Sequence, residues 1–180
     1  MMHNLFRPTE YFAYFTITSS LLTAVILTLS AIQLFRGVAE TKWMSLSRLT
    51  MAVSMVIVGV IYNALLRGGD LDPRDVGYDW PVLPNEVLHT YVPILIFIEW
   101  MLTRTTIALK INQAFWVLLY PLAWLAFSFA RGLTQGWWPY WFIDPQYGIG
   151  TQATWIVVIA VMFSVLALGF IPAQRAIARR

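Results

Sequence analysis

Residues 89–98 read HTYVPILIFI, a run in which one imidazole opens an otherwise apolar stretch. The apolar segment around this run, residues 86–106, has the length of roughly 20 residues that a helix needs to cross a bilayer. An ionisable residue inside such a segment is a functional-site hypothesis by default. His89 is therefore the first candidate site residue. The alternative is a histidine that is simply satisfied near the membrane interface, where water is within reach.

The rest of the chain is as apolar as this run. Of its 180 residues, 59% are hydrophobic and only 12% are charged, which is too apolar a balance for a soluble domain. Five apolar segments of membrane-spanning length cover residues 10–34, 46–66, 86–106, 114–130 and 152–171. They lack the alternation of barrel strands, so we predict helices. We expect one all-α polytopic membrane domain, residues 1–180, with five transmembrane helices.

The segment boundaries contain capping and loop signals. Pro8-Thr9 and Pro84-Asn85 precede the first and third segments, so we expect a capping side chain at each helix start, both on one side of the membrane. Residues 67–81 are rich in acids and turn formers, which predicts a solvated loop. Residues 136–145, GWWPYWFIDP, contain aromatics suited to the headgroup layer and two prolines that prevent a continuous span. We predict an aromatic interfacial or partly re-entrant loop there.

The distribution of basic residues predicts the orientation. With alternating sides, four Lys and Arg residues fall on the face of the amino terminus and eight on the opposite face. Cytoplasmic loops carry the excess of Lys and Arg, so we expect the amino terminus outside and the carboxyl terminus in the cytoplasm. No removable signal peptide is recognisable, and the first apolar segment is expected to target the chain.

Several kinds of chemistry lack the residues they need. The absence of cysteine excludes disulfides, iron–sulfur clusters and thiolate metal sites. One intramembrane histidine without clustered ligands does not predict a metal site or a bis-histidine haem. No predicted span contains a lysine for a retinal Schiff base, and no glycine-rich phosphate loop or basic nucleic-acid-binding face is present. We therefore expect no cofactor, no metal and no nucleic-acid partner, and the sequence leaves the oligomeric state open.

Thr16 and His89 are expected at similar depth. Counted from helix starts at Thr9 and Asn85, Thr16 lies about 10 Å and His89 about 6 Å along their helices. A threonine hydroxyl is too weakly acidic to attack a carbonyl unaided, but an imidazole that accepts its proton makes it a nucleophile. The depth match permits a Thr/His dyad in the outer leaflet. The alternative is a packing stripe of small hydroxyl residues, which also includes Ser19, Ser20, Thr23 and Ser30.

Glu99 is the one acidic residue expected near the middle of a span. An unpaired carboxylate there costs at least a few kcal/mol, so Glu99 must be protonated, paired or hydrated. It lies about 15 Å beyond His89 along the helix, which excludes direct contact between the two side chains. Two interpretations remain open: a structural partner for Arg48, Arg104 or a hydroxyl residue, and a polar floor to a ligand cavity.

Further polar residues are expected at the outer end of the bundle. Asn63, Tyr62, Tyr91 or the loop aromatics could orient the imidazole or a substrate carbonyl. Arg67 and Arg131 could hold a fatty-acid carboxylate by paired hydrogen bonds, and the alternative is ordinary headgroup anchoring.

Short motifs follow one another along nearly the whole chain from Tyr11 onward. They are Tyr14-Phe15-Thr16, Asn63-Ala64-Leu65-Leu66-Arg67, His89-Thr90 with Pro93 and Ile98-Glu99, Tyr120-Pro121, Arg131-Gly132, and Trp138-Pro139-Tyr140-Trp141-Phe142-Ile143-Asp144-Pro145 with Gly148. In this order, and with ten residues from His89 to Glu99, they resemble the androgen-induced protein family of multi-span membrane hydrolases and its bacterial relatives.

The resemblance implies a function. Members of that family are threonine hydrolases in which an intramembrane Thr and His cleave fatty acid esters of hydroxy fatty acids, lipids that bear a carboxylate and an internal ester. Carried over, Thr16 is the nucleophile and His89 the base. We therefore expect an intramembrane lipid-ester hydrolase, embedded in a bacterial inner (plasma) membrane, with a membrane lipid or fatty-acid ester as its substrate.

Two other classes of function remain as hypotheses. One is a non-enzymatic binder or transporter of a small amphipathic molecule, in which His89 and Glu99 are protonatable ligand contacts. The other is a structural subunit of a membrane assembly, which predicts a stable partner and tolerance of changes at His89.

Overall fold

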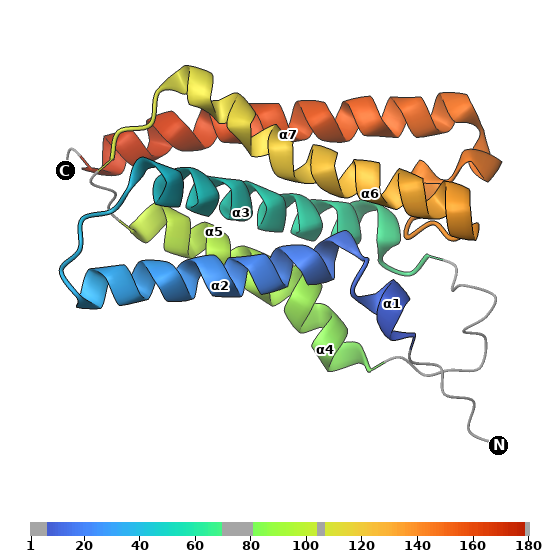
Figure 1. Cartoon of the computed structure of the whole chain (residues 1–180), viewed down its shortest axis with the longest axis horizontal. Coiled ribbons are helices and arrows are strands. Elements are labelled where there is room, and N and C mark those ends of the chain that lie inside the picture. The colour runs from blue at the N-terminus through green and yellow to red at the C-terminus, as the bar shows by residue number, and fades with distance from the viewer. Residues whose placement is uncertain (1–6, 70–80, 104–106, 179–180) are drawn as a thin grey trace.

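The computed structural model describes residues 7–69, 81–103 and 107–178. Within these residues the long helices run back and forth along one axis of an elongated bundle (Figure 1). The elements in chain order are α1 (Pro8–Tyr11), α2 (Phe15–Phe35), α3 (Lys42–Ile61), η1 (Tyr62–Leu66), α4 (Val82–Glu86), η3 (Val87–Tyr91), α5 (Val92–Leu102), η4 (Ile111–Leu118), α6 (Leu119–Gln135), η5 (Trp141–Ile143), η6 (Pro145–Tyr147) and α7 (Ile149–Ala178). This part of the chain contains no strand, which confirms the predicted all-α class.

Four helical runs are long and apolar enough to cross a membrane. They are Phe15–Phe35, Lys42–Leu66, Ile111–Gln135 and Ile149–Ala176. The predicted membrane class is supported to that extent. Residues 82–102 form another helical pass through the bundle, but polar residues crowd its first half, and its crossing of the bilayer stays a prediction.

The predicted helix caps are wrong. Thr9 lies inside the short helix α1, the chain bends after it, and α2 begins only at Phe15. Asn85 lies inside α4, which begins at Val82 because the first turn of a helix accommodates Pro84 without losing a hydrogen bond. Thr16 is therefore the second residue of its helix, and His89 lies about 10 Å from the start of its own. The two starts do lie at the same end of the bundle, as expected (Figure 1).

Helix α3 forms the centre of the bundle. It packs against α2, α5 and α7, and its side chains Leu49, Val53 and Met55 are completely buried. A Cβ atom on Gly59 would lie 2.9 Å from the Cβ of Pro93, so the glycine allows α3 to approach the 82–102 pass closely. The outward faces of the other long helices remain apolar, as helices that contact lipid require. Examples of exposed side chains are Leu22, Ile94, Leu122 and Val165.

The aromatic segment after α6 folds back onto one end of the bundle. Phe142 and Ile143 are buried, and the Ile143 carbonyl accepts a hydrogen bond from Gln152 Nε2 at 2.5 Å. Two short 3-10 turns, η5 and η6, replace the continuous helix that the prolines forbid. The predicted loop is therefore present at the expected place in the chain, and its position relative to a membrane stays a prediction. The predicted solvated loop, residues 67–81, lies mostly outside the described residues.

Gly132 is the residue that lets this segment close onto α6. A Cβ atom at this position would overlap the indole ring of Trp138, so we expect Gly132→Ala to lower the free energy of unfolding by about 1–3 kcal/mol. Thermal unfolding in detergent, followed by circular dichroism, measures the loss. Gly169→Ala in α7 is the matched control because nothing lies within 4 Å of its added methyl group. Equal stability of the two variants would show that Trp138 does not seat on Gly132.

Candidate functional site

A cavity of about 100 Å³ extends from one end of the bundle toward its middle. Its wall comes from α2, α3 with η1, η3, α6, α7 and the loop after α6. Most of the lining side chains are apolar. The polar ones are Thr16, Tyr62, His89 and Tyr140, together with Trp124, whose indole N–H donates to the Ala13 carbonyl at 2.9 Å.

The cavity is elongated along the helices. On α3 and η1 its lining runs from Ile57 to Leu66, nine residues or about 13 Å. Its polar members lie toward the end of the bundle where α2 starts and in the loop after α6, while its other end is closed by apolar side chains such as Phe163. This shape suits a molecule with one reactive polar group and a hydrocarbon chain.

His89 is half-buried and is held in a defined orientation. Its Nδ1 lies 2.9 Å from the backbone carbonyl of Asn85. A carbonyl can only accept, so Nδ1 is the donor and, in the neutral ring, Nε2 is the acceptor. Among the residues that the structure describes, Nε2 has no hydrogen-bond partner. The free nitrogen is thus the one that can take a proton.

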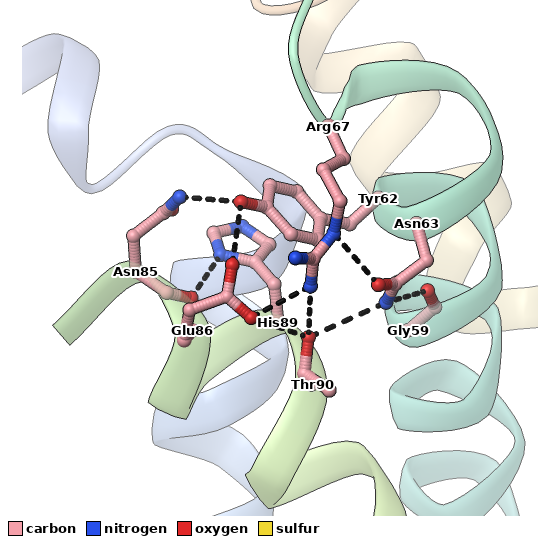
Figure 2. Close-up of polar contacts among 8 residues, drawn as sticks. All are labelled: Gly59, Tyr62, Asn63, Arg67, Asn85, Glu86, His89 and Thr90. Atoms are coloured by element: carbon pink, nitrogen blue, oxygen red, sulfur yellow. Dashed lines mark hydrogen bonds and ion pairs between the residues drawn. The ribbon is translucent and has the colours of Figure 1, made fainter. Parts of the chain in front are cut away.

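Tyr62 holds the imidazole from the side. Its ring stacks on His89 with centroids 4.3 Å apart and planes inclined by 25° (Figure 2). The Tyr62 hydroxyl accepts from Asn85 Nδ2 at 2.6 Å and donates to Glu86 Oε1 at 3.4 Å. Asn85 therefore contacts both rings: its backbone carbonyl accepts from His89, and its side-chain amide donates to Tyr62.

Two π-helical turns bring these residues together. η1 and η3 contact each other, and π-helical turns often occur at functional sites. In η1 the side-chain amide of Asn63 donates to the Gly59 carbonyl at 2.8 Å (Figure 2). The two turns place Tyr62 on one helix against His89 on the other.

A charged network lies beside the imidazole at the surface. Arg67 Nη2 pairs with Glu86 Oε2 at 2.6 Å and donates to Thr90 Oγ1 at 3.0 Å, while Arg67 Nε donates to Asn63 Oδ1 at 3.0 Å (Figure 2). The Arg67 side chain is 45% exposed, so this side of the site lies at the surface of the protein. The surface pair contributes little to stability, but it links η1 to η3.

Thr16 is buried and lies beside Tyr140. The Tyr140 hydroxyl lies close to the Thr16 side chain and to the backbone N–H groups at the first turn of α2. Burial raises the pKa of Tyr140 well above its ordinary value, which keeps the phenol protonated.

Thr16 and His89 line the same cavity, and α2 contacts η3. The site therefore brings both predicted residues together. Within the described part of the chain, no hydrogen bond joins the Thr16 hydroxyl to the His89 ring, whose Nδ1 is bonded to the Asn85 carbonyl. Catalytic hydrogen bonds of this kind are often long in an unliganded site and tighten when substrate binds.

No protein family model, curated protein or solved structure matches this chain. The resemblance to the androgen-induced protein family therefore stays a prediction.

Three of the predicted supporting residues do not line the cavity. Asn63 bonds to Gly59, Arg67 and Thr90, so it supports the η1–η3 contact and does not touch the imidazole. Arg67 is occupied by Glu86, Thr90 and Asn63. Arg131 donates to the Thr9 carbonyl and to Gln135 and lies over the Trp137 ring, 4.4 Å from its centroid.

Glu99 lies away from the cavity and is paired. Its Oε1 accepts from Arg48 Nη2 at 2.7 Å and from Thr103 Oγ1 at 2.9 Å, and Arg48 also pairs with Glu40 at 3.3 Å. The predicted span, residues 86–106, placed Glu99 near the middle of its helix. This position is wrong, because α5 ends at Leu102 and Glu99 lies in its last turn. Of the two interpretations, the structural partner of Arg48 is the one observed. The other expected partner, Arg104, lies outside the described residues.

The packing stripe on α2 is also observed in part. Ser19 Oγ lies 3.0 Å from the Tyr120 hydroxyl, which donates to Thr18 Oγ1 at 3.1 Å. These hydroxyls join α2 to α6 below the cavity, whereas Thr16 faces the cavity itself. Thr16 therefore differs from its neighbours in its surroundings.

Three contacts of the candidate site were missed by sequence reasoning. Tyr62 and the loop aromatics were named only as a group, and nothing singled out Tyr140 as the partner of Thr16. The carbonyl of Asn85 could not be foreseen, because the residue was expected to cap a helix. Among the residues described, no three His, Asp or Glu side chains gather as metal ligands would.

Proposed function

We propose that this protein is an intramembrane hydrolase that cleaves an ester bond of an amphipathic lipid, with Thr16 as nucleophile and His89 as general base. The observation that carries the proposal is that these two side chains, from separate helices, line one elongated apolar cavity at the same end of the bundle. A nucleophile and a base at the mouth of a chain-shaped cavity is the arrangement that acyl transfer needs.

The proposed reaction has two steps. In the first, Thr16 Oγ1 forms a bond to the ester carbonyl carbon while its proton passes to His89 Nε2. The carbon–oxygen bond to the alcohol breaks, and the proton on Nε2 passes to the departing alkoxide. In the second step water attacks the acyl-threonine, gives a proton to Nε2, and the fatty acid leaves as the Thr16 hydroxyl is restored by that proton.

The surroundings of His89 support both steps. The Asn85 carbonyl holds the tautomer with a free Nε2, so the ring is ready to accept a proton. The exposed Arg67–Glu86 pair beside it provides a route for the water of the second step. The apolar lining accepts the acyl chain, and fatty acid esters of hydroxy fatty acids or similar lipid esters are the substrate class we propose.

The proposed setting is a bacterial inner membrane with the cavity mouth in the outer leaflet. The end of the bundle that holds Thr16 and His89 is the end with fewer basic residues, and the other end is the cytoplasmic one by the positive-inside rule. Arg67 and Arg131 both lie at the cavity end, but both are engaged by residues of the chain. We therefore assign them to holding the fold and not to binding a substrate carboxylate.

A fluorophosphonate probe tests the assignment of the nucleophile. We expect the purified protein in detergent to be labelled on Thr16, as mapped by mass spectrometry of the tryptic or chymotryptic peptides. Thr16→Ala should not be labelled, while Thr18→Ala, two residues along the same helix, should be labelled at the wild-type rate. Labelling of another residue, or equal labelling of the Thr16→Ala variant, would reject the dyad.

A second candidate function is the binding of an amphipathic molecule without chemistry. It is favoured by one observation: within the described residues, no hydrogen bond joins the Thr16 hydroxyl to the His89 ring, whose Nδ1 is bonded to the Asn85 carbonyl. Saturable binding of a fluorescent fatty acid, with no labelling of Thr16 and no turnover of fatty-acyl esters, is the result that this function predicts.

A further inference from the structure

Tyr140 is a polar residue of the cavity to which the proposed reaction assigns no role. It comes from the loop after α6 and lies at the mouth of the cavity with Thr16 and His89. Three aromatic rings hold its own ring in place: Phe142 stacks on it with centroids 5.0 Å apart, and Tyr14 and Trp124 lie at 5.7 and 5.9 Å. Such a rigid setting fits a hydroxyl whose position matters.

The hydroxyl of Tyr140 lies beside the nucleophile. Thr16 lines the same cavity, and the Tyr140 ring contacts that of Tyr14, two residues before Thr16 in the chain. The hydroxyl itself lies close to the Thr16 side chain at the first turn of α2. A protonated phenol has one proton to donate. Tyr140 can therefore donate toward a group that reacts with Thr16, and the proton of Thr16 itself is left for another acceptor, the role we assign to His89.

This arrangement has a consequence once Thr16 attacks an ester. The attacking oxygen becomes a weak acceptor when it bonds to carbon, and the negative charge moves to the carbonyl oxygen attached to that same carbon. A donor beside the attacking oxygen is within reach of the new oxyanion as well.

We infer that Tyr140 is a catalytic residue, the donor that stabilises the oxyanion formed when Thr16 attacks the substrate carbonyl. The inference rests on the proposed hydrolase function and adds to it the third group that acyl transfer requires. Burial keeps the proton on this phenol at neutral pH, so Tyr140 acts as a donor and not as a second base.

The test compares two tyrosine-to-phenylalanine changes in the same loop. Tyr140→Phe keeps the ring and its aromatic contacts but removes the hydroxyl, and we expect kcat for a fatty-acyl ester to fall about 10²- to 10³-fold with little change in KM. Tyr147→Phe is the control, because Tyr147 is 55% exposed and lies outside the cavity. Its kcat should equal that of the wild type.

A second readout separates oxyanion stabilisation from a merely structural role. An alkyl trifluoromethyl ketone, which forms a tetrahedral adduct with the nucleophile, should lose affinity for Tyr140→Phe by the same factor as kcat/KM. The binding of a fluorescent fatty acid, which forms no adduct, and the melting temperature should stay unchanged. Parallel losses of fatty-acid binding or of melting temperature would overturn the inference.

The outcomes for this inference and for the proposed function are distinct. A Tyr140→Phe variant that turns over at the wild-type rate, while Thr16→Ala is inactive, would overturn the role of Tyr140 and leave the dyad intact. A wild-type protein that neither hydrolyses fatty-acyl esters nor is labelled on Thr16 would reject the hydrolase and the oxyanion donor together.

Discussion

Replacing His89 by phenylalanine is expected to lower ester turnover by about 10²- to 10⁴-fold, the usual contribution of a general base. Phenylalanine retains a flat ring that can stack on Tyr62, so the helices should keep their places. What disappears is the nitrogen that accepts the proton of Thr16. Hydrolysis of a fluorogenic fatty-acyl ester by the purified protein in detergent measures the effect, with the loss appearing in kcat.

The control for this change lies two residues away. Tyr91→Phe removes a hydroxyl from the same π-helical turn, but its side chain is 55% exposed and does not line the cavity. Its turnover should match that of the wild type. Turnover at the wild-type rate by His89→Phe would show that the imidazole is only a packing element stacked on Tyr62.

Replacing Arg48 by methionine is expected to lower the free energy of unfolding by about 3–5 kcal/mol, the cost of removing one partner of a buried ion pair. The Arg48 side chain is only 4% exposed and serves two carboxylates, Glu40 and Glu99. Without it both acids lose the guanidinium with which they pair, and Trp100 loses the cation that lies 5.9 Å from its ring centroid. Unfolding by titration with a denaturing detergent measures the loss.

The double variant Arg48→Met/Glu99→Met should regain part of that stability, because replacing both partners by apolar groups removes the uncompensated charge. Lys42→Met, an exposed change at the start of the same helix, should leave unfolding unchanged. An Arg48→Met variant as stable as Lys42→Met would mean that the ion pairs contribute nothing, and Glu99 would regain its place as a candidate ligand contact.

The helical class and the approximate helix positions could be predicted from the sequence. A run such as residues 46–66 is recognisable because membrane-spanning length and hydropathy are properties of a continuous stretch, and the observed helices α3 and η1 end at the predicted Leu66. The alternatives for Glu99 were also correctly framed, since a carboxylate among apolar residues needs a partner. Which cation pairs with Glu99 depends on the packing of α3 against α5.

The starts of α2 and α4 could not be predicted. Proline followed by a capping side chain is a frequent helix start, but here Pro8 and Pro84 both lie within the first turn of short helices that come before the expected ones. The depth estimates based on those starts were therefore wrong for both Thr16 and His89. The two residues still line one cavity, because both helices begin at the same end of the bundle.

Composition and hydropathy, which are properties of continuous stretches, were sufficient to indicate an all-helical membrane protein and to single out His89. Thr16 was suggested by the family resemblance and by a depth estimate whose helix start is wrong. The partners of these residues come from distant parts of the chain: Tyr62 stacks on His89 across two π-helical turns, and Tyr140 reaches Thr16 from the loop after α6. Hydrogen bonds and ring contacts of this kind depend on angles and distances of a few ångströms between packed helices. No pattern of residues along the chain encodes them, so only the folded bundle reveals them.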